Sequence, residues 1–267
     1  MIRAIVVGAA GRMGGTVVRT IHETSGIEVA GAVERPDHPL LNRDIGEVLG
    51  LGEIGVPLGG DIERVIGAGE VVIDFTNPEV SLRSLEVASK SGVSMVIGST
   101  GFTPQQLERV SHLAEKTRCV LSPNMSVGVN LMFKLVGEIA RILGEEYDVE
   151  ILEAHHRFKK DSPSGTAMKL GEIVASALNR DFPQVGVFGR KGVIGERKPQ
   201  EIGMQAVRAG DIVGDHTVIF GGLGERLEVT HRAHSRDNFA RGAVRAAKWV
   251  VTQPNGLYDM GDVLGLK

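Results

Sequence analysis

The first fourteen residues constrain the fold more than any other part of this sequence. A short β-branched run at 2–7 leads directly into Gly8, Gly11 and Gly14, and a segment of helical period follows. A run this short and apolar predicts a buried strand, and glycine permits the tight turn by which a strand passes into a helix. The sequence therefore predicts a fold that begins with a strand, a glycine turn and a helix.

The same turn is suited to a phosphate group. Helix N-termini offer free N–H donors, and glycines let the backbone approach a pyrophosphate closely. The spacing here is G-x-x-G-x-x-G, which is less specific than the G-x-G-x-x-G fingerprint. Glu34 stands at the end of the next predicted strand, directly after Val33, at the distance of about 20 residues from the glycine turn where an acid binds ribose hydroxyls. Arg35 would instead hold a ribose phosphate, so the pattern predicts a nicotinamide dinucleotide and leaves NADH and NADPH open. A tight turn beside a solvated Glu-Arg pair is the alternative.

Strand and helix patterns alternate through the first half of the chain. Strands are predicted at 2–7, 28–33, 71–75, 93–97 and 119–121, and helices at 12–24, 78–91 and 104–117. Asn77-Pro78 and Thr103-Pro104 are cap-then-proline signals for two of these helices. Residues 36–69 predict loops with one weak strand. The alternation indicates an α/β fold, a Rossmann-like doubly wound parallel sheet.

The pattern changes after Met125. Helices are predicted at 127–143, 165–178 and 237–251, and strands at 147–154, 202–209, 217–220 and 226–231. Consecutive strands of this kind predict a second, α+β domain that contains a mixed sheet.

Three loops follow the later strands of the first half, at 75–77, 98–101 and 122–125. Each could be an ordinary turn. Because ligands of open α/β sheets bind at the carboxyl edge of the strands, the three loops together are expected to line the nicotinamide end of the site.

Residues 153–166 hold the densest set of titratable groups, including His155, His156 and Lys159. Adjacent histidines on an extended chain point to opposite sides and no cysteine is near, so a metal site is disfavoured. A basic surface loop is the other alternative. Ser164-Gly165-Thr166 begins a predicted helix, where hydroxyls and backbone N–H groups suit a carboxylate. We therefore expect a small anionic substrate and proton transfer by histidine or lysine.

Composition excludes several classes of protein. Lys and Arg number 30 against 33 Asp and Glu, a net charge of −3 that offers no general attraction for nucleic acid. The single cysteine, Cys119, lies in a strand-like run and is expected to be a buried structural thiol. No signal peptide pattern and no apolar run of about 18 residues is present, so we expect a cytoplasmic protein without a membrane partner.

The motifs resemble those of the bacterial dihydrodipicolinate reductase family. They are GAAGRMG at 8–14, DFTNPE at 74–79, GSTGF at 98–102, SPNMSVGVN at 122–130, EAHHRFKKDSPSGTA at 153–167 and THRAHSRDNFARGAV at 230–244. The resemblance implies NADH- or NADPH-dependent reduction of hydroxy-tetrahydrodipicolinate in diaminopimelate and lysine biosynthesis. It also implies a dinucleotide-binding domain at 1–125 and 235–267, and a substrate-binding and oligomerisation domain at 126–234 that forms a homotetramer.

The resemblance further assigns roles to residues. His155 matches the family's general acid/base and Lys159 its proton donor, whereas His156, Gly165 and Thr166 match contacts to the substrate carboxylates. Many members carry alanine where this chain has Ser122 and Ser162, and a larger side chain at Met125. The implied cofactor contacts are Gly8, Ala9, Ala10, Gly11, Arg12, Met13, Glu34, Arg35, Gly98, Ser99, Thr100, Ser122, Pro123, Asn124 and Met125.

Two other functions would share parts of this pattern. A dehydrogenase of an amino-acid semialdehyde would keep the first domain but use different groups in place of His155 and Lys159. A nucleotide sensor without catalytic activity would keep Glu34 and the glycine turn and would not need His155 or Lys159.

Overall fold

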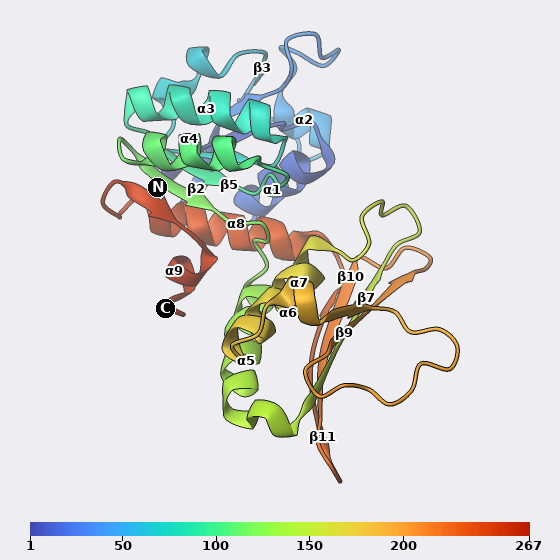
Figure 1. Cartoon of the computed structure of the whole chain (residues 1–267). Helices are drawn as coiled ribbons and strands as arrows, with labels where there is room; N and C mark the ends of the chain where they lie inside the picture. The colour runs from blue at the N-terminus through green and yellow to red at the C-terminus, as the bar shows by residue number, and fades with distance from the viewer. The chain divides into compact units, whose positions relative to one another are not determined.

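The computed structural model describes residues 1–267 and divides into two compact units (Figure 1). The first unit combines Met1–Val127 with Arg236–Lys267, and the second is Gly128–Ser235. No helix combines the length and the apolar character that crossing a bilayer requires.

The first unit is built on a parallel sheet in the order β12-β6-β5-β4-β1-β2-β3. The chain leaves β1 toward β2 and β3 on one side, and later adds β4, β5 and β6 on the other, so β1 and β4 flank the topological switch point. Ligand crevices of doubly wound sheets lie at this point. The predicted Rossmann-like fold is confirmed. The strands are β1 (Ile2–Val7), β2 (Ile27–Val33), β3 (Leu58–Gly59), β4 (Val71–Asp74), β5 (Ser94–Ile97), β6 (Arg118–Leu121) and β12 (Gly256–Tyr258).

Helices cover both faces of this sheet (Figure 1). On one face, α1 (Arg12–His22) and α8 (Asp237–Val250) pack on Ala4 and Val6 of β1. On the other, α3 (Pro78–Ser91) and α4 (Pro104–Ala114) pack with Ile5 and Val7. Successive side chains of a strand point to opposite faces, so one continuous apolar run supplies both cores.

Both predicted helix starts are confirmed by their caps. The side chain of Asn77 accepts a hydrogen bond from the backbone N–H of Val80 (3.1 Å) at the start of α3. Thr103 and Gln106 form a reciprocal capping box at α4. α4 ends at Ala114, earlier than predicted, and the buried hydroxyl of Thr117 beyond it donates to the carbonyl of Val93 (2.7 Å).

Residues 36–69 contain more structure than their sequence predicted. They form α2 (Ile45–Leu49), β3 and the short 3-10 helices η1 (Ile62–Arg64) and η2 (Ile66–Ala68). The carboxylate of Asp44 organises the turn because it accepts hydrogen bonds from four backbone N–H groups, of Gly46, Glu47, Ile54 and Val56. β12 and α9 (Met260–Leu264) were not predicted.

The second unit contains the predicted mixed sheet, in the order β11-β10-β7-β9-β8. Its central strand β7 runs parallel to β9 and antiparallel to β10. Two long helices, α5 and α6, bury one face of the sheet, where Ile151, Met204 and Phe220 lie in the core (Figure 1). The short α7 and β8 were not predicted. The elements are α5 (Val127–Leu143), η3 (Gly144–Glu146), β7 (Asp148–His155), α6 (Gly165–Ala177), α7 (Phe182–Val185), β8 (Gly186–Phe188), β9 (Ile202–Arg208), β10 (Gly214–Gly221) and β11 (Arg226–Ala233).

Candidate active site

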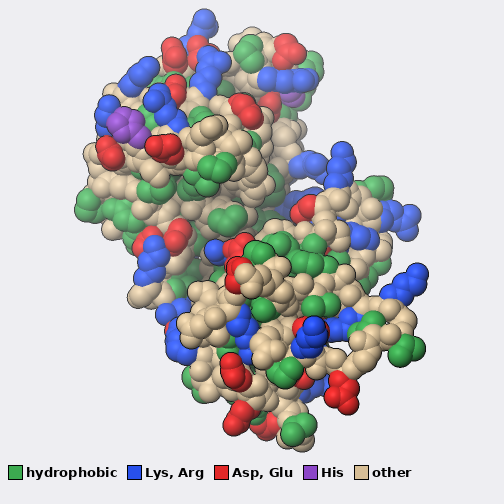
Figure 2. Space-filling model, viewed as in Figure 1, with side chains coloured by type: hydrophobic (Ala, Val, Ile, Leu, Met, Phe, Trp, Pro, Cys, Tyr) green, Lys and Arg blue, Asp and Glu red, His purple; other side chains and the backbone are tan.

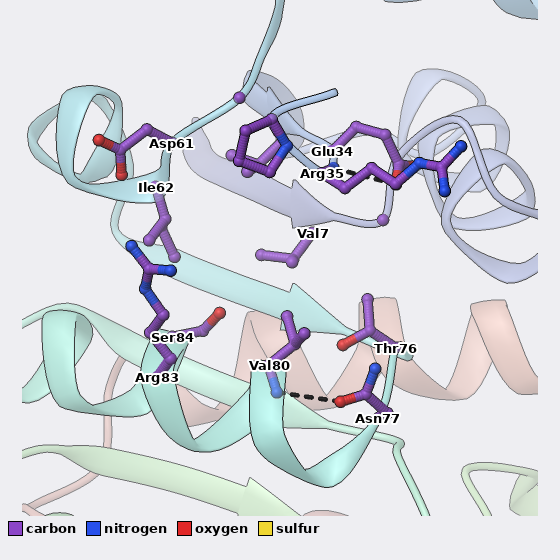
Figure 3. A pocket seen from close by; sticks show the side chains of 14 residues that line it. Val7, Glu34, Arg35, Asp61, Ile62, Thr76, Asn77, Val80, Arg83 and Ser84 are labelled. Carbon is purple, nitrogen blue, oxygen red and sulfur yellow. Dashed lines mark hydrogen bonds between the residues drawn. The ribbon is translucent and has the colours of Figure 1, made fainter. Parts of the chain in front are cut away.

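A pocket lies at the switch point of the first unit (Figure 3). Its volume is about 390 Å³ and its lining is mainly apolar, with charged groups at the rim. Glu34 and Arg35 lie on one side of it, and Val80 and Arg83 of α3 lie on the other (Figure 3). The lining residues are Val7, Gly8, Val33, Glu34, Arg35, Pro36, Gly60, Asp61, Ile62, Thr76, Asn77, Val80, Arg83 and Ser84.

The glycine positions of the turn before α1 have no room for a Cβ atom. Gly8 has a φ of +71°, and a Cβ added there would lie 2.8 Å from Cγ2 of Thr76. A Cβ on Gly14 would lie 2.0 Å from the carbonyl oxygen of Gly8, so α1 approaches the turn as closely as its backbone allows. Gly11 is the N-cap residue of α1, and no side chain accepts a hydrogen bond from the first turn of this helix. These features fit a dinucleotide, because a phosphate can take the place of the missing cap.

Charged residues lie at the rim of the pocket. Glu34 follows β2 directly, and its carboxylate accepts the backbone N–H of Arg35 (3.2 Å). The Arg35 guanidinium lies 3.4 Å from the carboxylate of Asp37, and both side chains are exposed. Arg83 adds a second cation that sequence reasoning missed. Its position one helical turn after Val80 is the only local signal for it.

The two remaining loops follow β5 and β6 at the same edge of the sheet, but they do not line this pocket. Ser99 is buried and its hydroxyl lies 2.8 Å from that of Ser81. Ser122 is buried and donates to the carbonyl of Asn124 (2.9 Å). The side chain of Met125 packs in the hydrophobic core.

Asp74 holds one residue of the pocket lining in place. It is fully buried at the end of β4, and its Oδ1 accepts from both the backbone N–H (2.8 Å) and the hydroxyl (2.6 Å) of Thr76. Burial raises the pKa of Asp74 more than its hydrogen bonds lower it. The carboxyl thereby fixes Thr76, whose side chain faces the pocket (Figure 3).

The titratable cluster of the second unit lies on the helix-covered face of its sheet. Glu153 and His155 are two residues apart on β7, so their side chains share this face. Strand pairing places His216 of β10 beside Glu153 and Arg208 of β9 beside His155. Gly214 of β10 lies next to His155, and a Cβ there would be 3.0 Å from Nε2 of the ring.

Hydrogen bonds connect this cluster. Nδ1 of His155 lies 2.5 Å from Oε2 of Glu153, and two nitrogens of Arg208 bind the same carboxylate at 2.7 and 2.8 Å. The backbone N–H of Ser164 donates to it as well (3.0 Å). Burial by itself would raise the pKa of Glu153, but these donors lower it overall.

Both buried histidines favour the neutral form. Burial lowers the pKa of His155, against the opposing effect of Glu153. Burial, together with the nearby His155, lowers the pKa of His216 to about 3. The two rings meet edge to face with centroids 5.2 Å apart, and Nε2 of His216 lies 3.2 Å from the hydroxyl of Ser164.

The other predicted residues of this cluster lie on the segment from β7 to α6. The His156 ring stacks obliquely on Phe158, with centroids 6.3 Å apart. Nζ of Lys159 lies 2.9 Å from the carboxylate of Asp161, and the lysine side chain is 22% exposed. No group of three or more His, Cys, Asp or Glu side chains is arranged so that it could hold a metal ion.

Gly165 and Thr166 form the first turn of α6, next to the N-cap residue Ser164. The Ser164 hydroxyl accepts the N–H of Ala167 (3.2 Å) and so caps the helix. This short segment joins the predicted carboxylate contacts to the buried cluster, because the same serine binds Glu153 and His216.

The sequence placed Glu153 in the titratable segment without a role, and Arg208 and His216 were missed. Two-residue spacing could have linked Glu153 to His155, since it places both side chains on one face of the strand. Arg208 and His216 come from other strands, and no local signal connects them to β7.

Family models match both parts of the chain. The model described as dihydrodipicolinate reductase, N-terminus, matches residues 2–125, and that described as dihydrodipicolinate reductase, C-terminus, matches residues 128–264. The chain belongs to the dihydrodipicolinate reductase family. The prediction of an oxidoreductase of this family is therefore confirmed.

Relatives and solved structures agree with this family. Proteins named 4-hydroxy-tetrahydrodipicolinate reductase from Citrifermentans bemidjiense and Syntrophus aciditrophicus are 57% and 56% identical, and each comparison covers both chains completely. A dihydrodipicolinate reductase from Paenisporosarcina, solved with dipicolinate bound, is 28% identical with a TM-score of 0.73, over 97% of either chain. An aspartate semialdehyde dehydrogenase from Vibrio cholerae, 10% identical with a TM-score of 0.56 over 94% of this chain and 98% of that one, shares the fold alone.

Proposed function

We propose that this chain catalyses the NADH- or NADPH-dependent reduction of 4-hydroxy-tetrahydrodipicolinate to tetrahydrodipicolinate, within diaminopimelate and lysine biosynthesis. The observation that carries the proposal is 57% identity, along the whole chain, to a reductase of that name. The buried cluster around His155 supports it, because proton transfer needs a titratable group held in a fixed position.

The first unit is the proposed dinucleotide-binding domain. The glycine turn and the uncapped start of α1, with Gly8, Ala9, Ala10, Gly11, Arg12 and Met13, would hold the pyrophosphate. Glu34 and Arg35 would bind the adenosine ribose or its phosphate at the pocket rim. Gly98–Thr100 and Ser122–Met125 are proposed to contact the nicotinamide half. The nicotinamide, when bound, supplies a hydride.

The second unit is the proposed substrate domain. Overall, the reaction adds one hydride and one proton to the ring and releases one water. His155, with Nδ1 bound to Glu153, is proposed to exchange a proton through Nε2, and Lys159 is proposed to donate the proton that accompanies the hydride. His156, Gly165 and Thr166 are proposed to contact the substrate carboxylates, since a helix N-terminus favours negative charge. The relative with bound dipicolinate supports a dicarboxylate ligand.

Absorbance of the reduced cofactor tests the function. The protein is mixed with NADH or NADPH and with the fresh condensation product of pyruvate and aspartate semialdehyde. We expect cofactor oxidation that requires all three components. Protein that binds either cofactor yet oxidises neither would contradict the proposal and would favour a nucleotide sensor. Oxidation of the cofactor with aspartate semialdehyde itself in place of the condensation product would favour a different nicotinamide enzyme, one that reduces the semialdehyde to its alcohol.

A homotetramer in the cytoplasm is proposed on the family resemblance. The sheet face opposite α5 and α6 exposes Leu152 and Val207, which a partner subunit would cover. The single cysteine is unpaired, as is usual in a reducing compartment. Light scattering coupled to size-exclusion chromatography should give four times the mass of the chain, and a monomer would contradict the proposal.

A further inference from the structure

Glu153 is a fully buried carboxylate that receives four hydrogen bonds. Its side chain is 0% exposed, and its donors are two nitrogens of Arg208, the backbone N–H of Ser164 and Nδ1 of His155. Burial of a carboxylate is unfavourable unless it is paired and hydrogen-bonded. The bidentate Arg208 and the Ser164 amide meet this condition, so Glu153 remains ionised within the cluster.

An ionised carboxylate only accepts hydrogen bonds. At the 2.5 Å contact with Glu153, Nδ1 of His155 must therefore carry the hydrogen. In the neutral ring the lone pair then lies on Nε2, which is the atom left to exchange a proton. Nε2 faces Gly214 of β10, where an added Cβ would lie 3.0 Å from it, so the residue at this position brings no side chain of its own against Nε2.

The charges around His155 make Glu153 decisive for its proton affinity. Arg208 and Lys159 are cations that oppose protonation of the ring, and His216 on β10 is a second imidazole at 5.2 Å. Glu153 is the one nearby acid whose hydrogen bond and charge favour the imidazolium. Loss of that charge would leave the two cations unopposed.

We propose that Glu153 is a positioning residue of the reaction, which fixes the Nδ1–H tautomer and the orientation of His155 so that Nε2 exchanges the proton. Arg208 and Ser164 act through Glu153, because they bind its carboxylate rather than the ring. The kinetic consequence of this inference rests on the proposed function. The tautomer of His155 can be measured without turnover.

Glu153→Gln tests the proposal, because it keeps the shape of the side chain and removes its charge. We expect kcat to fall about 100-fold, within the range attributed to proton transfer. The limb of the kcat/KM pH profile that reports His155 should move to lower pH. The Kd for NADH should stay within about twofold of the wild-type value, because the pocket lies in the other unit.

Glu150→Gln is the matched control. Glu150 also lies on β7 and also pairs with two arginines, Arg190 (2.9 Å) and Arg197 (3.1 Å), but on the opposite face of the sheet. Its substitution should leave kcat and the pH profile unchanged. Glu153→Asp, which keeps the charge, should keep the His155 limb near its wild-type position even if kcat falls.

Nitrogen-15 NMR of the histidine rings provides the readout that is independent of turnover. His155 is identified by the signals lost in His155→Ala. We expect the Nδ1–H tautomer in the wild-type protein, and a mixture of tautomers in Glu153→Gln. An Nε2–H tautomer in the wild-type protein, or wild-type kcat and an unmoved limb in Glu153→Gln, would overturn the proposal. An inactive wild-type protein with the Nδ1–H tautomer would instead reject the proposed function and leave the positioning intact.

Discussion

His155 and Lys159 belong to one short segment, yet the structure holds them differently. The histidine side chain is 10% exposed and fixed by Glu153, whereas the lysine is paired with Asp161, whose side chain is 59% exposed. The histidine is thus preorganised, whereas the lysine would have to leave a solvent-exposed partner in order to bind a substrate. This difference fits one group that is held by the protein and another that follows the ligand.

Replacement of either residue tests the roles proposed for them. His155→Ala and Lys159→Ala should each lower kcat by roughly 10² to 10⁴ while the Kd for NADH stays within about twofold. Steady-state kinetics and cofactor fluorescence measure the two quantities. Lys160→Ala is the control, because this neighbouring lysine is exposed. Wild-type turnover in both alanine variants would contradict the assignment.

Gly214 tests the geometry in front of Nε2. Gly214→Ala would place a methyl group 3.0 Å from this atom, so the His155 ring must shift. We expect kcat to fall about tenfold, since small displacements of a catalytic group are costly. Gly221→Ala, on the same strand with nothing near its added Cβ, should leave kcat unchanged. Equal kcat values for the two variants would contradict this geometry.

Glu34 and Arg35 set the cofactor preference in this interpretation. Arg35→Ala removes the cation expected to bind a ribose phosphate. The kcat/KM for NADPH should fall about tenfold more than that for NADH. Glu34→Ala should instead lower the kcat/KM for NADH more than that for NADPH. An Arg35→Ala variant that loses both activities equally would show that this cation does not distinguish the cofactors, and would point to Arg83 instead.

At the scale of elements, local signals predicted where helices begin better than where they end. Asn77-Pro78 and Thr103-Pro104 each specify a cap within a few residues, and both caps form. Three residues after the end of α4, the Thr117 hydroxyl donates to the carbonyl of Val93, a contact with the residue before β5 that no local signal near α4 could predict. β12 pairs with β6 across more than half of the chain, so nothing near residue 256 could predict it.

The capping box of α4 gives a prediction about stability. Thr103→Ala removes the side chain that binds the N–H of Gln106 (3.2 Å). The free energy of unfolding should fall by about 1 kcal/mol, with kcat unchanged. Denaturant unfolding measures the loss. Gln105→Ala, an exposed substitution in the same helical turn, should change stability much less. A Thr103→Ala variant as stable as the wild-type protein would show that the cap contributes little.

The candidate site could be predicted only in part at the scale of the whole molecule. Its chain-local pieces, the glycine turn with Glu34 and the segment from His155 to Thr166, were evident from spacing and residue type. Arg83 and Arg208 required the fold, because a helix and a neighbouring strand bring them to their positions. Sheet register likewise brings His216 of β10 and Arg208 of β9 to Glu153.

Acid sensitivity is a property of the whole chain that the buried cluster predicts. The pKa of His216 is about 3 when folded and near 6.5 when unfolded, so below pH 6.5 the unfolded state binds more protons. Stability is therefore lost as pH falls from 6.5 toward 3, and the lowered pKa values of His155 and Glu153 act in the same direction. The raised pKa of Asp74 acts in the opposite direction.

His216→Gln removes one of these titrations. The difference in unfolding free energy between pH 7 and pH 5 should shrink by about 1 to 2 kcal/mol relative to the wild-type protein. Urea unfolding at the two pH values measures it. His22→Gln, at an exposed position, should leave the difference unchanged. If His216→Gln shows the same difference in unfolding free energy as the wild-type protein, His216 is not the source of the acid sensitivity.

The discontinuous first unit affects the order in which the chain can fold during synthesis. α8 and β12 come from the last part of the chain, yet they cover one face of the first sheet and pair with its β6 edge. Until the ribosome has released them, Val6, Val96 and Val120 lack the helix that buries them. Gly128–Ser235 is continuous and leaves the exit tunnel earlier. The unit that is translated first is thus the last to be completed, and the nascent chain must protect an apolar sheet face until translation ends.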